Sequence, residues 1–576
     1  MSNRDFIRLR RILHEAEITR SLPRAEKAYG ELLDLLFRNQ APPDIGLTPF
    51  LQCLTYRFGG SGASLPWDLG GKNSYLDRFL LDSVRHGGKE IPPEAVSRLL
   101  SRRLEPENRE DLSAGHTLSG IMEKIPFLEN SGVLPVQFMF RGEPMRSGAG
   151  NSGGLWTLLL NLGNSLARSS RTAGVITVAA YDTLSAAYPF VALEFPGPDH
   201  ALIRLPLEIG GEGYENLLEA QTRIEYAVSG LSRVLVRYVP SANVVFHLRY
   251  LDPASVASAR AAGPYGIPRV LTLTPDPHRL IGIDRDTPGL EQLSKILAGD
   301  ELIALSRGII GIGRHSIARS LVPYFPVLEN TEERLIQGID EGIRLHTGED
   351  RAVTDPGFSD GDITLKISKE NRHRPVLLNV GRLHPAKGQE ALVRGWAEYG
   401  LWERYNLVFI GGDIDNPSPQ EAEFIEWFDD YMDQAPHLRG RAAHIGARPN
   451  DEVRRIQTFL GMNSDPDAPN AYVCPSLKEE FGISILEAMS AGMIVFAPVL
   501  GGAPEYIRHR INGFLIDTSG PETIGRELRT YLVENRPGPK QIEAVRRLAE
   551  ETIRLRYSLD KISGDFIDFY CRLGEE

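Results

Sequence analysis

The sequence predicts an α/β protein with two parallel, doubly wound sheets, and three observations support this prediction. Strand-like apolar runs alternate with helical runs from Val133 onward, and the alternation begins again at Pro375. A polar stretch rich in Asp, Gly and Thr separates the two alternating regions, at residues 346–374. Ahead of both regions, residues 1–130 carry apolar residues three and four positions apart, which predicts helices.

These patterns divide the chain into five parts, in order along the sequence. We expect a helical N-terminal extension at 1–130, a first α/β domain at 131–345, a linker or insertion at 346–374, a second α/β domain at 375–539 and a C-terminal helix at 540–576. Strand candidates of the first domain are Val133–Phe140, Gly174–Tyr181, Arg233–Val239, Asn243–Leu248 and Arg269–Thr274. Those of the second are Val376–Asn379, Asn406–Ile410, Ala443–Ile445, Ala471–Cys474 and Ile494–Ala497. Ligands of such sheets bind where the strands end, so the loops after the strands are the first candidates for a site.

Composition and charge narrow the classes of function. The chain has 576 residues, of which 42% are hydrophobic and 24% charged, as in ordinary globular proteins. A net charge of −12 argues against nucleic-acid binding. The three cysteines are far apart and form no zinc or disulfide pattern, which favours a reducing, cytoplasmic location.

Membrane association is not expected from the sequence. It contains no apolar run of about eighteen residues, the length that would span a bilayer. The N-terminus has no apolar core of a signal peptide. Its arginines, at positions 4, 8, 10 and 11, are interpreted as the solvent side of a helix that packs on the protein rather than on a membrane.

The segment with the most chemical information runs from Pro475 to Gly492. A helix is predicted to begin near Gly482, and the unpaired N–H groups at Phe481 and Gly482 can bind negative charge. Glu487 lies inside this almost wholly apolar helix, where a carboxylate needs a hydrogen-bonding partner. A hydroxyl-rich ligand or an internal polar group would both satisfy it, and the residues alone leave the two open.

Seven residues separate Glu479 from Glu487, and Phe-Gly follows shortly after the first glutamate. The full string, Pro-Ser and then Glu-x-Phe-Gly-x4-Glu-Ala-Met-x-x-Gly, resembles the paired-glutamate motif of retaining GT-B glycosyltransferases. These are the relatives of sucrose and sucrose-phosphate synthases, the fourth family of the sequence-based classification. The resemblance implies two facing Rossmann-like domains and a C-terminal helix that packs back on the first of them. It also implies that Glu479, Phe481 and Gly482 hold the donor sugar and that Glu487 binds the ribose.

Earlier segments of the second domain resemble the rest of the family's donor site, in the expected order. Asn379–Gly388 resembles the diphosphate-binding strand and loop, which implies that Arg382 and Lys387 hold the donor diphosphate. Two fixed cations would stabilise the charge of the leaving group. The segment that begins at His444 resembles the one that contacts the nucleotide base, through the backbone near Ile445.

Three residues of the first domain also resemble parts of the family's site. The Gly-rich loop at 148–156 is similar to the family's Gly-Gly loop facing the diphosphate, which makes Gly153 and Gly154 candidate contacts. Phe246–Tyr250 resembles the family's His-containing segment, which implies a catalytic role for His247.

The acceptor side departs from the family pattern at the end of the strand before residue 275. Relatives usually carry a histidine there, whereas this chain has Thr274 followed by a proline, with His278 slightly later. Arg314 is a further candidate for this side, with a salt-bridged helix start as the alternative. The departure leaves acceptor choice and catalytic competence as open questions.

The resemblance implies a retaining hexosyltransferase, with a glucosyl group, a UDP-linked donor and a small sugar or sugar-phosphate acceptor as first expectations. Neither a metal nor a cofactor is expected, since Arg382, Lys387 and helix dipoles supply the positive charge. A homo-oligomer is compatible with the sequence. The alternatives are a sugar phosphorylase, a nucleotide-sugar epimerase and a catalytically silent nucleotide-sugar-binding regulatory protein. A dinucleotide oxidoreductase fits G-x-G-x-x-G at 148–153 but lacks a convincing ribose-binding acid.

Overall fold

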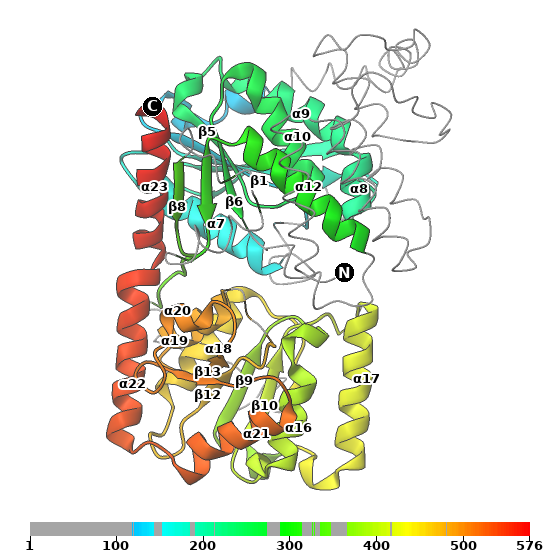
Figure 1. Cartoon of the computed structure of the whole chain (residues 1–576), viewed down its shortest axis with the longest axis vertical. Coiled ribbons are helices and arrows are strands. Elements are labelled where there is room, and N and C mark those ends of the chain that lie inside the picture. The colour runs from blue at the N-terminus through cyan, green and yellow to red at the C-terminus, as the bar shows by residue number, and fades with distance from the viewer. Residues whose placement is uncertain are drawn as a thin grey trace, which may run out of the picture. The chain divides into compact units, whose positions relative to one another are not determined.

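The computed structural model divides the chain into two compact units (Figure 1). It describes residues 118–575, apart from 119, 143, 145–152, 185–189, 212, 274–288, 314–324, 326–327, 329–334, 347–365, 415–416, 478 and 480. The first unit holds Leu166–Ile339, Phe566–Glu576 and the described part of Met1–Arg141. The second holds Gly142–Ser165 and Asp340–Asp565. The helices predicted for the N-terminal extension lie almost wholly outside the described residues.

The first unit is built on an eight-stranded sheet with the order β3-β4-β2-β1-β5-β6-β7-β8. Its strands are β1 Leu134–Met139, β2 Val175–Asp182, β3 Leu193–Gly197, β4 His200–Leu207, β5 Val244–Leu248, β6 Arg269–Leu273, β7 Gly308–Gly311 and β8 Leu335–Gly338. All pairings are parallel except that of β3 with β4. Strands β1 and β5 are buried along their whole length, as expected of strands that helices cover on both faces.

Helices complete the first unit. They are α8 Tyr214–Glu219, α9 Gln221–Leu235, α10 Pro253–Ala262 and α12 Gly289–Leu305. Helix α7, Gly153–Ala167, belongs to the second unit up to Ser165. Helix α10 packs against α8, α9 and α12. It begins at Pro253 because Asp252 caps it, accepting a hydrogen bond from Ser255 N at 2.8 Å. The predicted strand Arg233–Val239 is wrong: α9 continues to Leu235, and tertiary packing overrides the β-branched run.

The second unit has a six-stranded, fully parallel sheet with the order β11-β10-β9-β12-β13-β14. Its strands are β9 Val376–Val380, β10 Asn406–Ile410, β11 Ala442–His444, β12 Ala471–Val473, β13 Ile494–Pro498 and β14 Phe514–Ile516. Helices are α16 Gln389–Glu398, α17 Pro419–Gln434, α18 Asn450–Met462, α19 Ile483–Ser490, α20 Ala503–Tyr506, α21 Pro521–Arg529 and α22 Pro539–Thr552. Strand order reverses between β9 and β12, which is where doubly wound sheets bind ligands. Both sheets confirm the α/β prediction.

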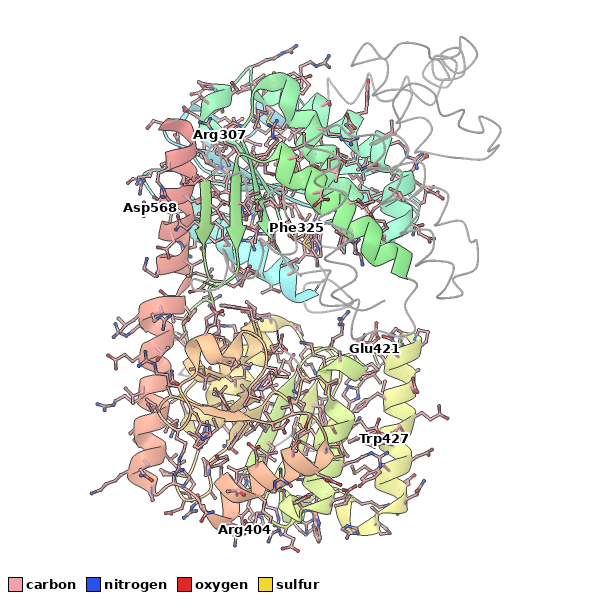
Figure 2. The ribbon with its side chains drawn as sticks, in the orientation of Figure 1. Arg307, Phe325, Arg404, Glu421, Trp427 and Asp568 are labelled. Carbon is pink, nitrogen blue, oxygen red and sulfur yellow. The ribbon has the colours of Figure 1, made fainter. Side chains whose placement is uncertain are left out.

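The start of helix α17 has a clear local cause, and the C-terminal helix is interrupted by a turn. Helix α17 begins with a capping box, in which Ser418 and Glu421 bond to each other's backbone N–H groups, and Trp427 follows further along it (Figure 2). The predicted C-terminal helix is two helices: a π-helical turn at Ile553–Tyr557 separates α22 from α23, Leu559–Glu575. The end of α23 packs on the first unit, where Asp568 pairs with Arg171.

Candidate functional site

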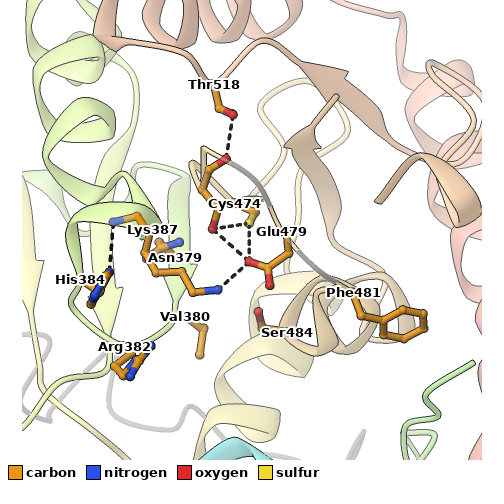
Figure 3. Close-up of polar contacts among 12 residues, drawn as sticks. Asn379, Val380, Arg382, His384, Lys387, Cys474, Glu479, Phe481, Ser484 and Thr518 are labelled. Atoms are coloured by element: carbon orange, nitrogen blue, oxygen red, sulfur yellow. Dashed lines mark hydrogen bonds and ion pairs between the residues drawn. The ribbon is translucent and has the colours of Figure 1, made fainter. Parts of the chain in front are cut away.

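The centre of the candidate site is an ion pair between the loops that follow β9 and β12. Lys387 Nζ donates to Glu479 Oε2 at 2.7 Å (Figure 3). The hydroxyl of Ser476 donates to the same oxygen at 3.0 Å, and the thiol of Cys474 lies 3.7 Å from it. All three groups contact Oε2. Oε1 of Glu479 has no hydrogen bond among the described residues. One oxygen of Glu479 is thus used inside the protein, and the other is available to a ligand.

Backbone contacts hold these two loops together. Gly388 adopts φ +67°, and a Cβ placed there would lie 2.1 Å from the carbonyl oxygen of Pro475. The backbone of Glu479 also pairs with the loop after β13, because Gly502 N donates to its carbonyl at 2.8 Å. Thr518 Oγ1, beyond β14, donates to the carbonyl of Ser476 at 2.7 Å. Four loops at the carboxyl ends of neighbouring strands therefore fix the position of Glu479.

The start of α19 lies directly after Glu479. Gly482 caps the helix with φ +84°, and a Cβ there would lie 2.8 Å from the hydroxyl of Tyr506. That hydroxyl donates to the carbonyl of Phe481 at 2.6 Å, in a buried setting. Tyr506 thereby fixes the turn that carries the first N–H groups of α19. These groups can bind an anion or a ligand oxygen beside the Lys387–Glu479 pair.

Glu487 is buried within α19, with 9% of its surface exposed. Asn450 Nδ2, at the start of α18, donates to its Oε1 at 3.3 Å. Burial raises the pKa of Glu487, while the hydrogen bond from Asn450 and the positive charge of Arg454 lower it in part. The sequence left open what meets this carboxylate, and the structure supplies internal partners from α18. Neither Asn450 nor Arg454 was predicted from the sequence.

We expect the stability of Glu487→Gln relative to the wild type to increase with pH. Because the pKa is raised in the folded state, the stabilising effect of the protonated carboxyl is present below its ordinary value of 4.5. That effect is lost as the pH rises through the folded pKa, and a glutamine avoids the loss. Urea unfolding of both proteins at about pH 5 and about pH 8 measures the difference. If the difference in free energy of unfolding stayed constant or shrank with pH, the pKa of Glu487 could not be raised by burial. Glu390→Gln, at an exposed position, serves as the control.

The other predicted donor residues lie at the same edge of the sheet. Arg382 is exposed on the loop after β9, and its carbonyl accepts a hydrogen bond from the buried Gln389 at 2.8 Å. Figure 3 shows Arg382 and Lys387 on the same loop. Ile445 follows β11 and is buried, with its N–H donating to the carbonyl of Phe409 at 3.1 Å. His444 Nε2 donates to the carbonyl of Gly411 at 2.7 Å, which joins the ends of β10 and β11.

His247 occupies the interior of the first unit. One ring nitrogen lies 2.7 Å from the hydroxyl of Thr272, and the other lies 2.7 Å from the hydroxyl of Tyr570 on α23. Burial, with a smaller effect from the charge of Arg249, lowers the pKa of His247 well below its usual range. With both nitrogens bonded inside the core, this placement favours a structural role for His247 over the predicted catalytic role.

The remaining predicted residues of the first domain are only partly within the described structure. Gly153 and Gly154 form the start of α7. Thr274, His278 and Arg314 lie outside the described residues.

In the part of the chain that the structure describes, no group of three or more His, Cys, Asp or Glu side chains is arranged to hold a metal ion. The helices of that part include none long and apolar enough to cross a membrane.

Comparisons with known proteins match the part of the chain that carries this site. Residues 362–552 match the family model described as Glycosyl transferases group 1. The chain is 31% identical over 201 residues to a sucrose synthase of Acidithiobacillus caldus, which covers 33% of this chain and 24% of that protein. It is 27% identical over 238 residues to sucrose synthase 4 of Oryza sativa subsp. japonica, covering 41% of this chain and 28% of that protein. The matches thus span about a quarter of these relatives' length.

Solved structures show which fold the chain shares. Sucrose-phosphate synthase of Thermosynechococcus elongatus aligns with a TM-score of 0.58 at 17% identity, over 77% of this chain and 99% of that one. The catalytic domain of starch synthase IV of Arabidopsis thaliana aligns with a TM-score of 0.51 at 16% identity, over 77% of this chain and 100% of that domain. At this identity the likeness concerns the fold, which is the GT-B fold that the family resemblance implied.

Proposed function

The chain carries a glycosyl transferases group 1 domain on the GT-B fold of sucrose synthase-related glycosyltransferases, and from this premise we propose that it is a retaining hexosyltransferase. The donor is a nucleotide sugar, with UDP-glucose as the first expectation. The acceptor is a small sugar or sugar phosphate. Sucrose synthases among the relatives and a sucrose-phosphate synthase among the fold neighbours support this choice of substrates.

The Lys387–Glu479 pair carries the proposal. It lies where the strand order of the second sheet reverses, between the ends of β9 and β12. A lysine ammonium has several N–H donors, and one of them is held by Glu479. The other donors of Lys387 can bind diphosphate oxygens. Oε1 of Glu479, which has no hydrogen bond among the described residues, can accept one from a hydroxyl of the donor sugar.

In the proposed reaction, the bond between the anomeric carbon and the diphosphate oxygen breaks, and the bond to the acceptor oxygen forms on the same face. The acceptor hydroxyl gives its proton to an oxygen of the departing diphosphate. Lys387 and Arg382 stabilise the negative charge that develops on the leaving group. Glu479 orients the sugar through its hydroxyls and keeps Lys387 in place. No protein carboxylate attacks the sugar in this scheme, in contrast to the paired carboxylates of glycosidases.

The experiment is nucleotide release from a panel of UDP-, GDP- and ADP-sugars, with and without pooled small acceptors. Wild type, Lys387→Ala and the exposed control Lys540→Ala are compared. We expect acceptor-dependent release in the wild type and the control, and a loss of about 10²–10³-fold in Lys387→Ala. Nucleotide release that depends on inorganic phosphate would indicate a phosphorylase. Conversion of the donor into another nucleotide sugar, without nucleotide release, would indicate an epimerase. Nucleotide binding without any release would support a regulatory binding protein.

A further inference from the structure

The segment through which the chain enters the second unit is held by the start of α23. The larger segment of the second unit runs from Asp340 to Asp565, where the chain returns to the first unit. Ile343 N donates to the carbonyl of Tyr557 at 2.9 Å, and Leu559 N donates to the carbonyl of Ile343 at 2.9 Å. These bonds join the entering segment to the break between α22 and α23. We call residues 343–346 the entry segment.

A buried arginine of α18 holds the next residues of the entry segment. Arg454 has 2% of its surface exposed. Its Nη1 donates to the carbonyl of Arg344 at 2.7 Å, and its Nη2 donates to the carbonyl of Leu345 at 3.1 Å. His346 Nδ1 lies 3.1 Å from the hydroxyl of Ser490 on α19. The entry segment is therefore bonded to both helices that flank the candidate nucleotide site.

The same two helices hold Glu487. Asn450, which donates to Glu487, lies one helical turn before Arg454 on α18, so the two side chains share a face. Ser490 lies three residues after Glu487 on α19 and shares its face in the same way. The positive charge of Arg454 lowers the pKa of Glu487. One face of α18 thus bonds the carboxylate through Asn450 and two backbone carbonyls of the entry segment through Arg454.

We propose that Arg454 is a positioning residue that couples nucleotide occupancy at Glu487 to the order of the entry segment. The inference rests on the proposed function, and it takes from the family resemblance that Glu487 binds the ribose of the donor nucleotide. Asn450 links Glu487 to α18, and the planar guanidinium fork of Arg454 links α18 to the carbonyls of Arg344 and Leu345. A shift of Glu487 that moves α18 therefore moves these carbonyls as well. Coupling of this kind is reciprocal: if the nucleotide orders the entry segment, loosening that segment weakens nucleotide binding by the same factor.

The test compares Arg454→Met and Arg454→Lys with the wild type and with Arg455→Met. Arg455 is the matched control because it is exposed on the same helix and, among the described residues, donates to the carbonyl of Asp451 on its own helix. Calorimetry measures the affinity for whichever of UDP, GDP and ADP binds the wild type most tightly. Hydrogen–deuterium exchange follows the amides of residues 343–346 with and without that nucleotide. Arg454→Lys keeps the charge beside Glu487 but loses the two-pronged bond to the carbonyls.

We expect the nucleotide to slow exchange of the entry segment in the wild type and in Arg455→Met. In Arg454→Met, this protection should disappear and the affinity should fall about tenfold, within the usual range of coupling between sites. Compared with Arg454→Met, Arg454→Lys should recover part of the nucleotide affinity but not the slowed exchange of residues 343–346. General unfolding would lower both and would not separate them. Normal affinity and normal protection in Arg454→Met would overturn this inference alone. A wild type that binds none of the three nucleotides would instead contradict the proposed function.

Discussion

Glu479→Gln is expected to lower kcat/KM by about 10²–10³-fold while the protein remains folded. The substitution keeps the shape of the side chain and removes the negative charge that holds Lys387 at 2.7 Å. Without that charge, Lys387 loses its fixed position, and the carboxylate that would accept from the sugar hydroxyls is also lost. Since 33% of the lysine side chain and 14% of the glutamate side chain are exposed, the effect on stability should stay within about 1 kcal/mol.

Initial rates with the donor identified by the panel, together with urea unfolding, check this result. Glu390→Gln is the matched control, because Glu390 is exposed and pairs with Arg394 one turn along α16. The control should retain wild-type turnover. Wild-type turnover in Glu479→Gln would remove the Lys387–Glu479 pair from the proposed mechanism. A large loss of stability would show that the pair is mainly structural.

The centre of the site could be predicted because its residues follow strands that become neighbours. The string around Glu479 and the loop with Arg382 and Lys387 each come directly after a short apolar strand. In a doubly wound sheet, the first and fourth strands lie together, so the loops after β9 and β12 meet. The resemblance named the residues, and the strand order explains why they come into contact across ninety-two positions of sequence.

The partners of Glu487 could not be predicted, because they depend on how two helices pack. Asn450 and Arg454 resemble ordinary polar residues of an amphipathic helix. The bond from Asn450 to Glu487 on α19 requires close approach of α18, which Gly461 permits: a Cβ there would lie 1.9 Å from the carbonyl of Ala491. Neither periodicity nor a local motif contains this information. The same limit explains the error at Arg233–Val239, where packing of α9 decides the conformation.

The second large effect is expected from Gly388→Ala, through the backbone rather than through a reacting group. A non-glycine residue at φ +67° costs about 1–2 kcal/mol, before any steric clash is counted. The added Cβ would lie 2.1 Å from the carbonyl oxygen of Pro475, a backbone atom that can move only with its loop. That loop continues into Ser476 and Glu479, so relieving the clash displaces the carboxylate from Lys387.

Gly388→Ala should therefore lower both the free energy of unfolding and the turnover, whereas Glu479→Gln should lower turnover alone. The matched control is Gly520→Ala, since Gly520 has extended backbone and open space where a Cβ would lie. Urea unfolding and acceptor-dependent nucleotide release, measured on both variants, separate the two effects. If Gly388→Ala unfolded at the wild-type midpoint with full turnover, the loops after β9 and β12 would have to be adaptable. The fixed position of Lys387 could then not be part of the mechanism, because its stabilisation of the leaving diphosphate depends on a site arranged before the donor binds.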